Sequence, residues 1–318
     1  MPRQSTLVTK APAHGRTARL YALIARARPV AVVFRRGPSN QVRLIRWTLN
    51  NDRFQPGQWL KARVYPQRCD LSPDGELLCY FAGNFRAPYA TWTPISRPPY
   101  FTALALWRKG DAWGGGGLFD SRIRLRLNHR PVPYHHGRDE MTLAEGFRLP
   151  KRFAVDPLGD HAGWGEDDPV RWMRLQRDGW LFVQEPQGRR WEDFDAPVRL
   201  TTETPEIVAK PMNTRAGLLY TLRVACHGSF ERDGRASVET GEVVGPGPAQ
   251  STLRDLGRID WADLDHNGDV LWAWAGKLWR LPRPKRVADF ATAEPRLLAD
   301  FNDMRFEAIA PPASAQRW

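Results

Sequence analysis

The sequence has 318 residues, a formal net charge of +12 and only three Cys. An odd number of Cys argues against a disulfide framework and favours reduced, buried thiols, as in a cytoplasmic protein. No apolar stretch approaches the roughly 18 residues that a membrane span needs, so we expect no membrane partner. The 14 Trp and only 5 Met are typical of a β-rich protein, because aromatic side chains favour strands.

The net positive charge comes entirely from the N-terminal part of the chain. Residues 1–63 hold 13 Lys or Arg against a single acid, Asp52, and the remainder is neutral, with 34 basic (47 − 13) and 34 acidic (35 − 1) residues. A one-sided basic segment can bind nucleic acid, acidic protein or anionic lipid. Arg also predominates over Lys along the whole chain, which accounts for the excess without a binding site. We therefore expect no nucleic-acid partner and keep nucleic-acid binding through residues 1–63 as an alternative.

The chain begins with a polar, basic segment, residues 1–28, that contains few apolar residues. We predict a mobile tail there, with a short helix at Ala18–Ala27. Apolar runs typical of strands follow at Val30–Phe34, Val42–Leu49 and Gln58–Tyr65.

A β-hairpin signal then appears and recurs along the chain. The turn Ser72-Pro73-Asp74-Gly75 joins two short apolar runs, and Gly accepts the positive φ that tight turns need. Asp178-Gly179, Asn267-Gly268 and, more faintly, Gly217 repeat the pattern. We predict that the first three are equivalent hairpin turns on one face of the molecule. Their spacing favours units of roughly 40–50 residues, the length of a four-stranded propeller blade.

On the Ser72–Gly75 turn and its weaker echoes, the sequence resembles WD-repeat and related β-propellers. The resemblance implies an all-β fold: a closed β-propeller of five to seven blades, six being favoured, with a central channel and two loop-bearing faces. Residues 29–318 would form this one domain. Phe306–Pro311 would be a strand begun at the C-terminus and completed by strands from residues 30–65, so that terminal strands close the ring. The resemblance implies no activity.

Two stretches depart from this pattern. Gly110–Gly117 contains four consecutive Gly but lacks the Lys and Ser/Thr of a phosphate loop, so we predict a bulge or flexible turn. Residues 129–169 are dense in Pro and Gly and show little periodicity, which predicts an irregular surface insertion.

Two groups of residues contain side chains that bind metals, but neither completes a site. The run Asp263-x-Asp265-x-Asn267-Gly268 begins like a calcium loop, yet Trp274 stands where the bidentate acid is needed, so the run is better explained as turn chemistry. The insertion holds imidazoles and carboxylates without regular ligand spacing. These are His129, His135, His136, Asp139 and Glu140. We predict no metal and no cofactor.

Acidic clusters at Glu166–Asp168 and Glu192–Asp195 leave an enzymatic alternative open. Paired carboxylates at the mouth of a propeller channel can hydrolyse glycosides. A hydrolase acting on glycan or peptide at the central channel is therefore the alternative from another class, although no Gly-x-Ser-x-Gly elbow occurs.

The sequence favours a non-enzymatic scaffold, monomeric in isolation, that binds an unidentified protein partner through its loop face. Aromatic and Arg side chains anchor many protein interfaces. The candidate binding residues lie in the Gly-rich loop and the insertion, and they are Trp113, His135, His136, Arg138 and Trp164.

Overall fold

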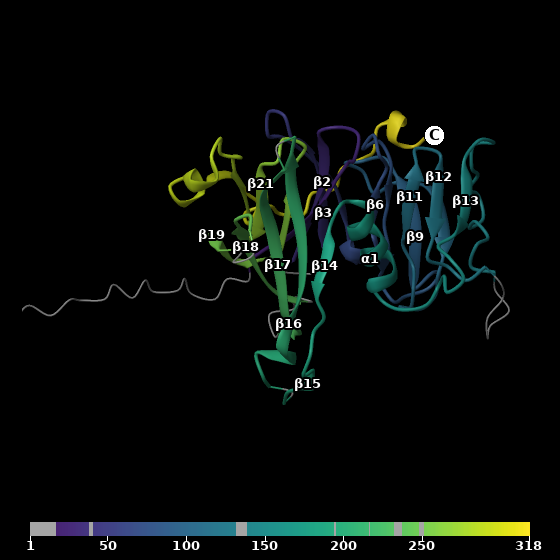
Figure 1. Ribbon diagram of the computed structural model, residues 1–318. Helices are drawn as coiled ribbons and strands as arrows, with labels where there is room; N and C mark the ends of the chain where they lie inside the picture. Colours follow the sequence, from purple (N-terminus) through teal and green to yellow (C-terminus); the bar gives the residue numbers. More distant parts are fainter. Residues whose placement is uncertain are drawn as a thin grey trace, which may run out of the picture.

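The computed structural model describes residues 17–37, 41–131, 139–193, 195–215, 217–231, 237–247 and 251–318. These residues are β-strands and loops apart from one α-helix, α1 (Asp168–Arg177), and three short 3₁₀ helices, η1 (Pro66–Arg68), η2 (Val287–Ala291) and η3 (Ala313–Ala315). The strands form five sheets (Figure 1). Within the described ranges, no helix is long and apolar enough to cross a membrane.

The first sheet is antiparallel and contains β1 (Arg19–Ile24), β2 (Val30–Arg36), β3 (Val42–Thr48) and β4 (Arg53–Leu60). Strand β1 corrects the sequence prediction of a tail through residue 28 with a helix at Ala18–Ala27. Leu20 and Ala22 of β1 are buried, and every residue of β1 is in register with β2. Residues 19–24 are mostly apolar, unlike the rest of the predicted tail, and pairing with β2 and burial of Leu20 and Ala22 make them a strand.

The second sheet carries the predicted Ser72–Gly75 hairpin. Its strands are β5 (Arg63–Val64), β6 (Asp70–Leu71), β7 (Leu78–Cys79), β8 (Ala82–Gly83), β9 (Thr91–Ser96) and β10 (Ala103–Arg108). β6 pairs with β7 on either side of the turn, which confirms this hairpin. Ser72 Oγ donates to Asp74 Oδ1 at 2.7 Å and accepts from the N–H of Leu77 at 2.9 Å.

The third sheet contains β11 (Gly117–Ser121), β12 (Arg124–Leu127) and β13 (Ala154–Pro157), with β13 parallel to β12. The described parts of the predicted insertion, residues 129–131 and 139–169, contain only this one strand and the start of α1. They also contribute buried side chains, such as Phe153 and Leu158. This segment therefore completes a sheet as well as forming loops.

The fourth and fifth sheets make up the C-terminal half. The fourth contains β14 (Leu181–Gln184), β15 (Arg190–Trp191), β16 (Val198–Thr214), β17 (Gly217–Glu231), β18 (Ser237–Val244) and β19 (Thr252–Ile259). The fifth contains β20 (Trp261–Leu264), β21 (Val270–Trp274), β22 (Lys277–Leu281) and β23 (Arg296–Asp300). In Figure 1 the long β16–β17 hairpin, with β15 at its end, extends away from the other sheets.

The prediction of repeated hairpin turns is confirmed at Asn267-Gly268 and Gly217 and is wrong at Asp178-Gly179. Asn267-Gly268 joins β20 to β21, and Gly217 follows the turn from β16 into β17. Asp178-Gly179 instead ends α1 and precedes β14, so the predicted hairpin at Val170–Glu185 is a helix followed by a strand. Asp168 and Pro169 in the first turn favour a helix, and Gly179, with φ +85°, suits the position after its end.

The remaining turns do lie near one another. The β1–β2 turn runs between them: the N–H of Ala27 donates to the carbonyl oxygen of Pro73 at 2.8 Å, and His266 Nε2 lies 3.3 Å from the carbonyl oxygen of Arg26. The Asp74-Gly75 and Asn267-Gly268 turns therefore share one face of the molecule.

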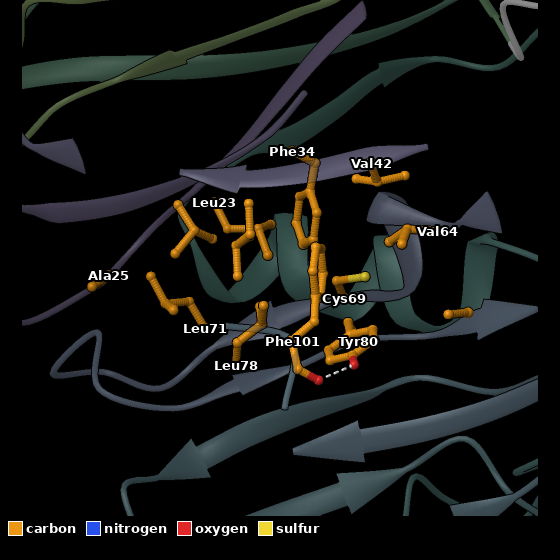
Figure 2. Packing of buried hydrophobic residues seen from close by; sticks show 13 residues of the cluster. Leu23, Ala25, Phe34, Val42, Val64, Cys69, Leu71, Leu78, Tyr80 and Phe101 are labelled. Carbon is orange, nitrogen blue, oxygen red and sulfur yellow. Dashed lines mark hydrogen bonds between the residues drawn. The ribbon is translucent and has the colours of Figure 1, made fainter. Parts of the chain in front are cut away.

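The first sheet packs between the second and the fifth, and its central strand β2 is buried on both faces. In β2, Ala31 and Val33 face the fifth sheet, whereas Val32 and Phe34 face the second. Such near-continuous apolar runs are typical of strands covered on both sides. Figure 2 shows the second of these layers, in which Phe34 packs above Phe101 and the Tyr80 hydroxyl donates to the Phe101 carbonyl oxygen at 2.6 Å.

Further layers extend this order. The second sheet packs on the third, and the fourth packs on the fifth. Helix α1 packs against the third sheet through Val170 and Leu118, and against the fourth sheet through Trp172, whose ring centroid lies 4.4 Å from that of Phe182. The described residues thus hold five sheets, whereas the resemblance implied five to seven blades with six favoured. An α-helix lies between the third and fourth sheets.

The expected C-terminal strand at Phe306–Pro311 is absent. Residues 301–318, all described, contain no strand, and the four strands of the first sheet all come from residues 19–60. The segment instead runs as a loop from the first sheet toward the third. Gln58 Nε2 of β4 donates to the Ile309 carbonyl oxygen at 3.0 Å, and Trp318 packs on Phe153, directly before β13. Because β1 already supplies a strand to the first sheet, a strand from the C-terminus is not needed there.

Candidate functional site

The Gly-rich loop before β11 is tightly packed, which corrects the prediction of a flexible turn. Gly114, Gly115 and Gly116 have φ values of +65°, +82° and +77°. A Cβ at Gly115 would lie 2.4 Å from the Phe81 ring, and one at Gly116 would lie 1.9 Å from the carbonyl oxygen of Arg68. Only Gly combines these backbone angles with this close approach.

The Arg68 side chain stabilises this loop by hydrogen bonds to its backbone. Its side chain is buried, and its Nη1 donates to the carbonyl oxygens of Ala112 and Gly114 at 2.6 and 2.7 Å. Its Nε lies 2.6 Å from Asp167, directly before α1. The N–H of Trp113 donates to Asp111 Oδ1 at 2.9 Å. The backbone around Trp113 is therefore fixed on both sides.

The structure brings the loops of Trp113 and Trp164 together, as the sequence could not show. The N–H of Gly114 donates to the carbonyl oxygen of Gly165 at 2.6 Å. The two indoles nevertheless remain 54% and 45% exposed. The Arg130 guanidinium carbon lies 5.1 Å from the Trp164 ring centroid, a cation–π distance. The other candidate residues, His135, His136 and Arg138, lie outside the described residues.

A third exposed aromatic residue lies in a turn that leads to a strand hydrogen-bonded to the Gly-rich loop. Phe85, in the β8–β9 turn, is 56% exposed. Thr91 at the start of β9 ties this turn to the Gly-rich loop, because its hydroxyl donates to the Asp111 carbonyl oxygen at 2.5 Å. We call Phe85, Trp113 and Trp164 the aromatic rim. Phe85 was not among the candidate binding residues, since nothing local in the sequence marks it as exposed.

A buried polar network supports the rim. Lys109 Nζ lies 3.0 Å from Glu140 and 2.8 Å from Asp111, and Arg130 Nη1 lies 2.9 Å from Glu140. His129 is fully buried, with Nδ1 2.9 Å from the Glu140 carbonyl oxygen and Nε2 2.8 Å from Thr93 Oγ1. Burial lowers the pKa of His129 to about 3, so the imidazole is neutral.

This network accounts for the candidate metal residues that the structure describes. His129 and Glu140 are engaged within it, and Asp139 accepts hydrogen bonds from Met141 N–H and Thr142. Asp265 of the calcium-like run accepts from the N–H groups of its own turn. In the described parts of the chain, no three His, Cys, Asp or Glu side chains gather as a metal ion requires.

A cavity of about 500 Å³ lies at the centre, between α1 and the first, fourth and fifth sheets. Six carboxylates line it, those of Asp70, Asp178, Glu206, Glu239, Asp263 and Asp265, and all but Glu239 are held in ion pairs. Asp70 lies 2.7 Å from Arg177, Glu206 2.6 Å from Arg171, and Asp263 2.7 Å from Lys210. Carboxylates bound in this way are not poised as a general acid and a nucleophile.

Neither acidic cluster that motivated the hydrolase alternative lines this cavity. Asp167 pairs with Arg68, and Glu192 pairs with Arg190 at 2.9 Å on the extended part of the fourth sheet. The two clusters are not brought together at one site.

The basic N-terminal segment uses its Arg residues to join parts of the fold. Arg35 is buried and donates to the carbonyl oxygens of Phe301 and Asn302. Arg46 pairs with Glu76 at 2.7 Å. Burial lowers the pKa of Arg36 to about 10. These strand Arg residues do not present one exposed basic face for nucleic acid.

No family model and no curated protein matches this sequence. Among solved structures, a chain of the mitotic checkpoint complex is 12% identical, with a TM-score of 0.37, over 89% of this chain and 99% of that one. The β-propeller domain of the Trilobed protease from Pyrococcus furiosus is 10% identical, with a TM-score of 0.28, over 91% and 100% of the two chains. An uncharacterized Listeria monocytogenes protein is 8% identical, with a TM-score of 0.23, over 90% and 84%.

Proposed function

We propose that this protein is a non-enzymatic propeller scaffold that binds a protein partner through the aromatic rim. The observation that carries the proposal is that Trp113 is held rigidly by its loop and is still 54% exposed. Trp is enriched among the residues that dominate binding energy at interfaces, and a loop whose backbone is already fixed loses little entropy on binding. Trp164 and Phe85 are also exposed, on segments that are joined to the Trp113 loop by hydrogen bonds.

The scaffold would be a ring in which α1 closes the gap between the third and fourth sheets. Val170 and Trp172 contact these sheets from two sides of the helix. In this reading the rim lies on loops of the second and third sheets, whose positions are fixed by the packed layers beneath them.

The charge beside the rim favours a partner segment that carries Lys or Arg. Asp160 and Glu166, which flank Trp164 in the sequence, are exposed. A cation is attracted by these carboxylates and by an exposed indole face such as that of Trp113, since Arg130 already lies over the Trp164 ring. The partner proposed is thus a protein with a basic segment.

The test is crosslinking and co-purification from native lysate, followed by mass spectrometry. The rim variant carries Trp113→Ala and Trp164→Ala. The matched control is Trp191→Ala, because Trp191 is 64% exposed on β15, at the end of the β16–β17 extension. We expect wild type and control to recover the same partner and the rim variant to recover at least tenfold less. Equal recovery by all three proteins would refute the proposal.

A further inference from the structure

We propose that the central cavity binds a small organic carboxylate with an apolar body. The cavity, of about 500 Å³, falls within the range of about 300–1,000 Å³ that small-molecule sites occupy. This inference does not depend on the proposed partner, because none of the rim residues lines the cavity.

The key group is Arg174, at the middle of the helical face that looks into the cavity. It is only 4% exposed. Its Nη1 donates to the carbonyl oxygens of Pro66, Gln67 and Cys69, and its Nη2 donates to the hydroxyl of Tyr21 at 2.6 Å. Each of these acceptors is neutral.

Arg174 differs in this respect from its neighbours on α1. Arg171 and Arg177, one turn before and after it, each pair with a carboxylate, Glu206 and Asp70. Arg174 forms no ion pair with any carboxylate of the described residues. Buried charges are ordinarily paired, because leaving water without a countercharge is costly. A bound anion would supply the missing countercharge.

Tyr21 of β1 provides a second donor beside Arg174. Its hydroxyl oxygen accepts from Arg174, while its own proton has no acceptor within the described ranges. Burial raises the pKa of Tyr21 above its ordinary value, so the proton is retained at neutral pH. A guanidinium and an adjacent hydroxyl are donors that suit a carboxylate.

The rest of the lining selects a single negative charge and an apolar body. Glu239 lies in the wall without a basic partner within ion-pair distance in the described parts of the chain, and burial raises its pKa. Because Glu239 adds a buried acid to the lining, a doubly charged anion such as phosphate should bind less well than a carboxylate. Leu175, Trp180 and Trp261 line the cavity as apolar surface.

The experiment combines calorimetric titration with thermal denaturation of the full chain. The probes are hexanoate, 3-phenylpropionate and indole-3-acetate, with 3-phenylpropionamide as a neutral isostere and inorganic phosphate as a dianion. We expect at least one carboxylate to bind and to raise the Tm. We expect phenylpropionamide to bind roughly tenfold more weakly than phenylpropionate, or not at all, since a hydrogen bond to a charged group contributes about 1.5–3 kcal/mol.

Tyr21→Phe removes only the hydroxyl and should weaken carboxylate binding about tenfold. The matched control is Tyr80→Phe, because the Tyr80 hydroxyl is also buried and hydrogen-bonded but does not line the cavity. The site is refuted if no carboxylate binds, if the amide binds as tightly as the acid, or if phosphate alone binds. Should Tyr21→Phe fail to fold, the comparison of acid with amide on the wild-type protein decides the matter.

Discussion

The guanidinium of Arg280 lies 2.7 Å from the carboxylate of Asp52, although the two residues are 228 positions apart. Arg280 belongs to β22 of the fifth sheet, and Asp52 lies in the turn between β3 and β4 of the first. The same guanidinium lies 2.5 Å from Asp265 and 2.6 Å from Asp269. The first and last sheets are therefore joined by a buried ion network and apolar packing, without a shared strand.

Replacing Arg280 with Met should strongly destabilise the fold. The Asp265 side chain is 1% exposed, and removing its partner leaves a buried charge uncompensated, which costs about 3–5 kcal/mol. Urea denaturation measures the change. Arg286→Met is the control, because Arg286 pairs with Asp289 while 83% exposed, and such surface pairs contribute under about 1 kcal/mol. Similar small losses in both variants would contradict the network's role.

Adding a methyl group to the Gly-rich loop should show how tightly it is packed. Gly116→Ala combines φ +77° with a clash against the Arg68 carbonyl oxygen, so we expect a loss of roughly 3 kcal/mol or more. Gly110 has φ +89° and no atom within 4 Å of a Cβ, so Gly110→Ala should cost only about 1–2 kcal/mol. Thermal and chemical denaturation compare the two. Equal costs would mean that the loop yields and does not hold Trp113 rigidly.

The buried His129 should make stability depend on pH. Its native pKa is about 3, below the value of about 6.5 in an unfolded chain. Only the unfolded state takes up the proton as the pH falls between these values, so stability is retained above about pH 6.5 and is lost toward pH 3. Between pH 7.5 and 5.0 the expected loss from this residue is ~2 kcal/mol.

Denaturation at several pH values checks this dependence on His129. His129→Gln should reduce the slope by that amount, whereas His161→Gln, at an exposed position, should leave it unchanged. An unaltered slope in His129→Gln would show that other groups produce the whole effect.

Helix α1 should contribute to stability as a packed layer of the fold. Val170 is fully buried against Leu118 of the third sheet, so Val170→Ala should cost roughly 2 kcal/mol. The control is Val183→Ala, because Val183 on β14 is 53% exposed and its truncation should change stability by under about 0.5 kcal/mol. Hydrogen exchange of α1 gives an independent readout. If α1 exchanges as fast as a frayed terminus in the wild type, it does not close the structure.

Part of the candidate site could be predicted from local sequence, and part depends on contacts between distant segments. Trp113 and Trp164 were found from the sequence because aromatic residues in loops are recognisable locally. The hydrogen bond from Gly114 to Gly165 that joins their loops, and the support from Arg68, depend on segments about 50–100 residues apart and have no local signature. Arg174 was missed because a helix was not expected at residues 168–177.

For the fold, the sequence by itself determined the turns and the strands that bury both faces. Asp74-Gly75 and Asn267-Gly268 form hairpin turns because positive φ and short apolar arms are local properties. Only the tertiary structure decided that residues 19–24 form a strand and that residues 168–177 form a helix. Both segments are short, and neither carries a local pattern that selects one conformation. Pairing with β2 selects the strand, and burial of Val170 between neighbouring layers favours the helix, so the deciding free energy comes from contacts that no local pattern contains.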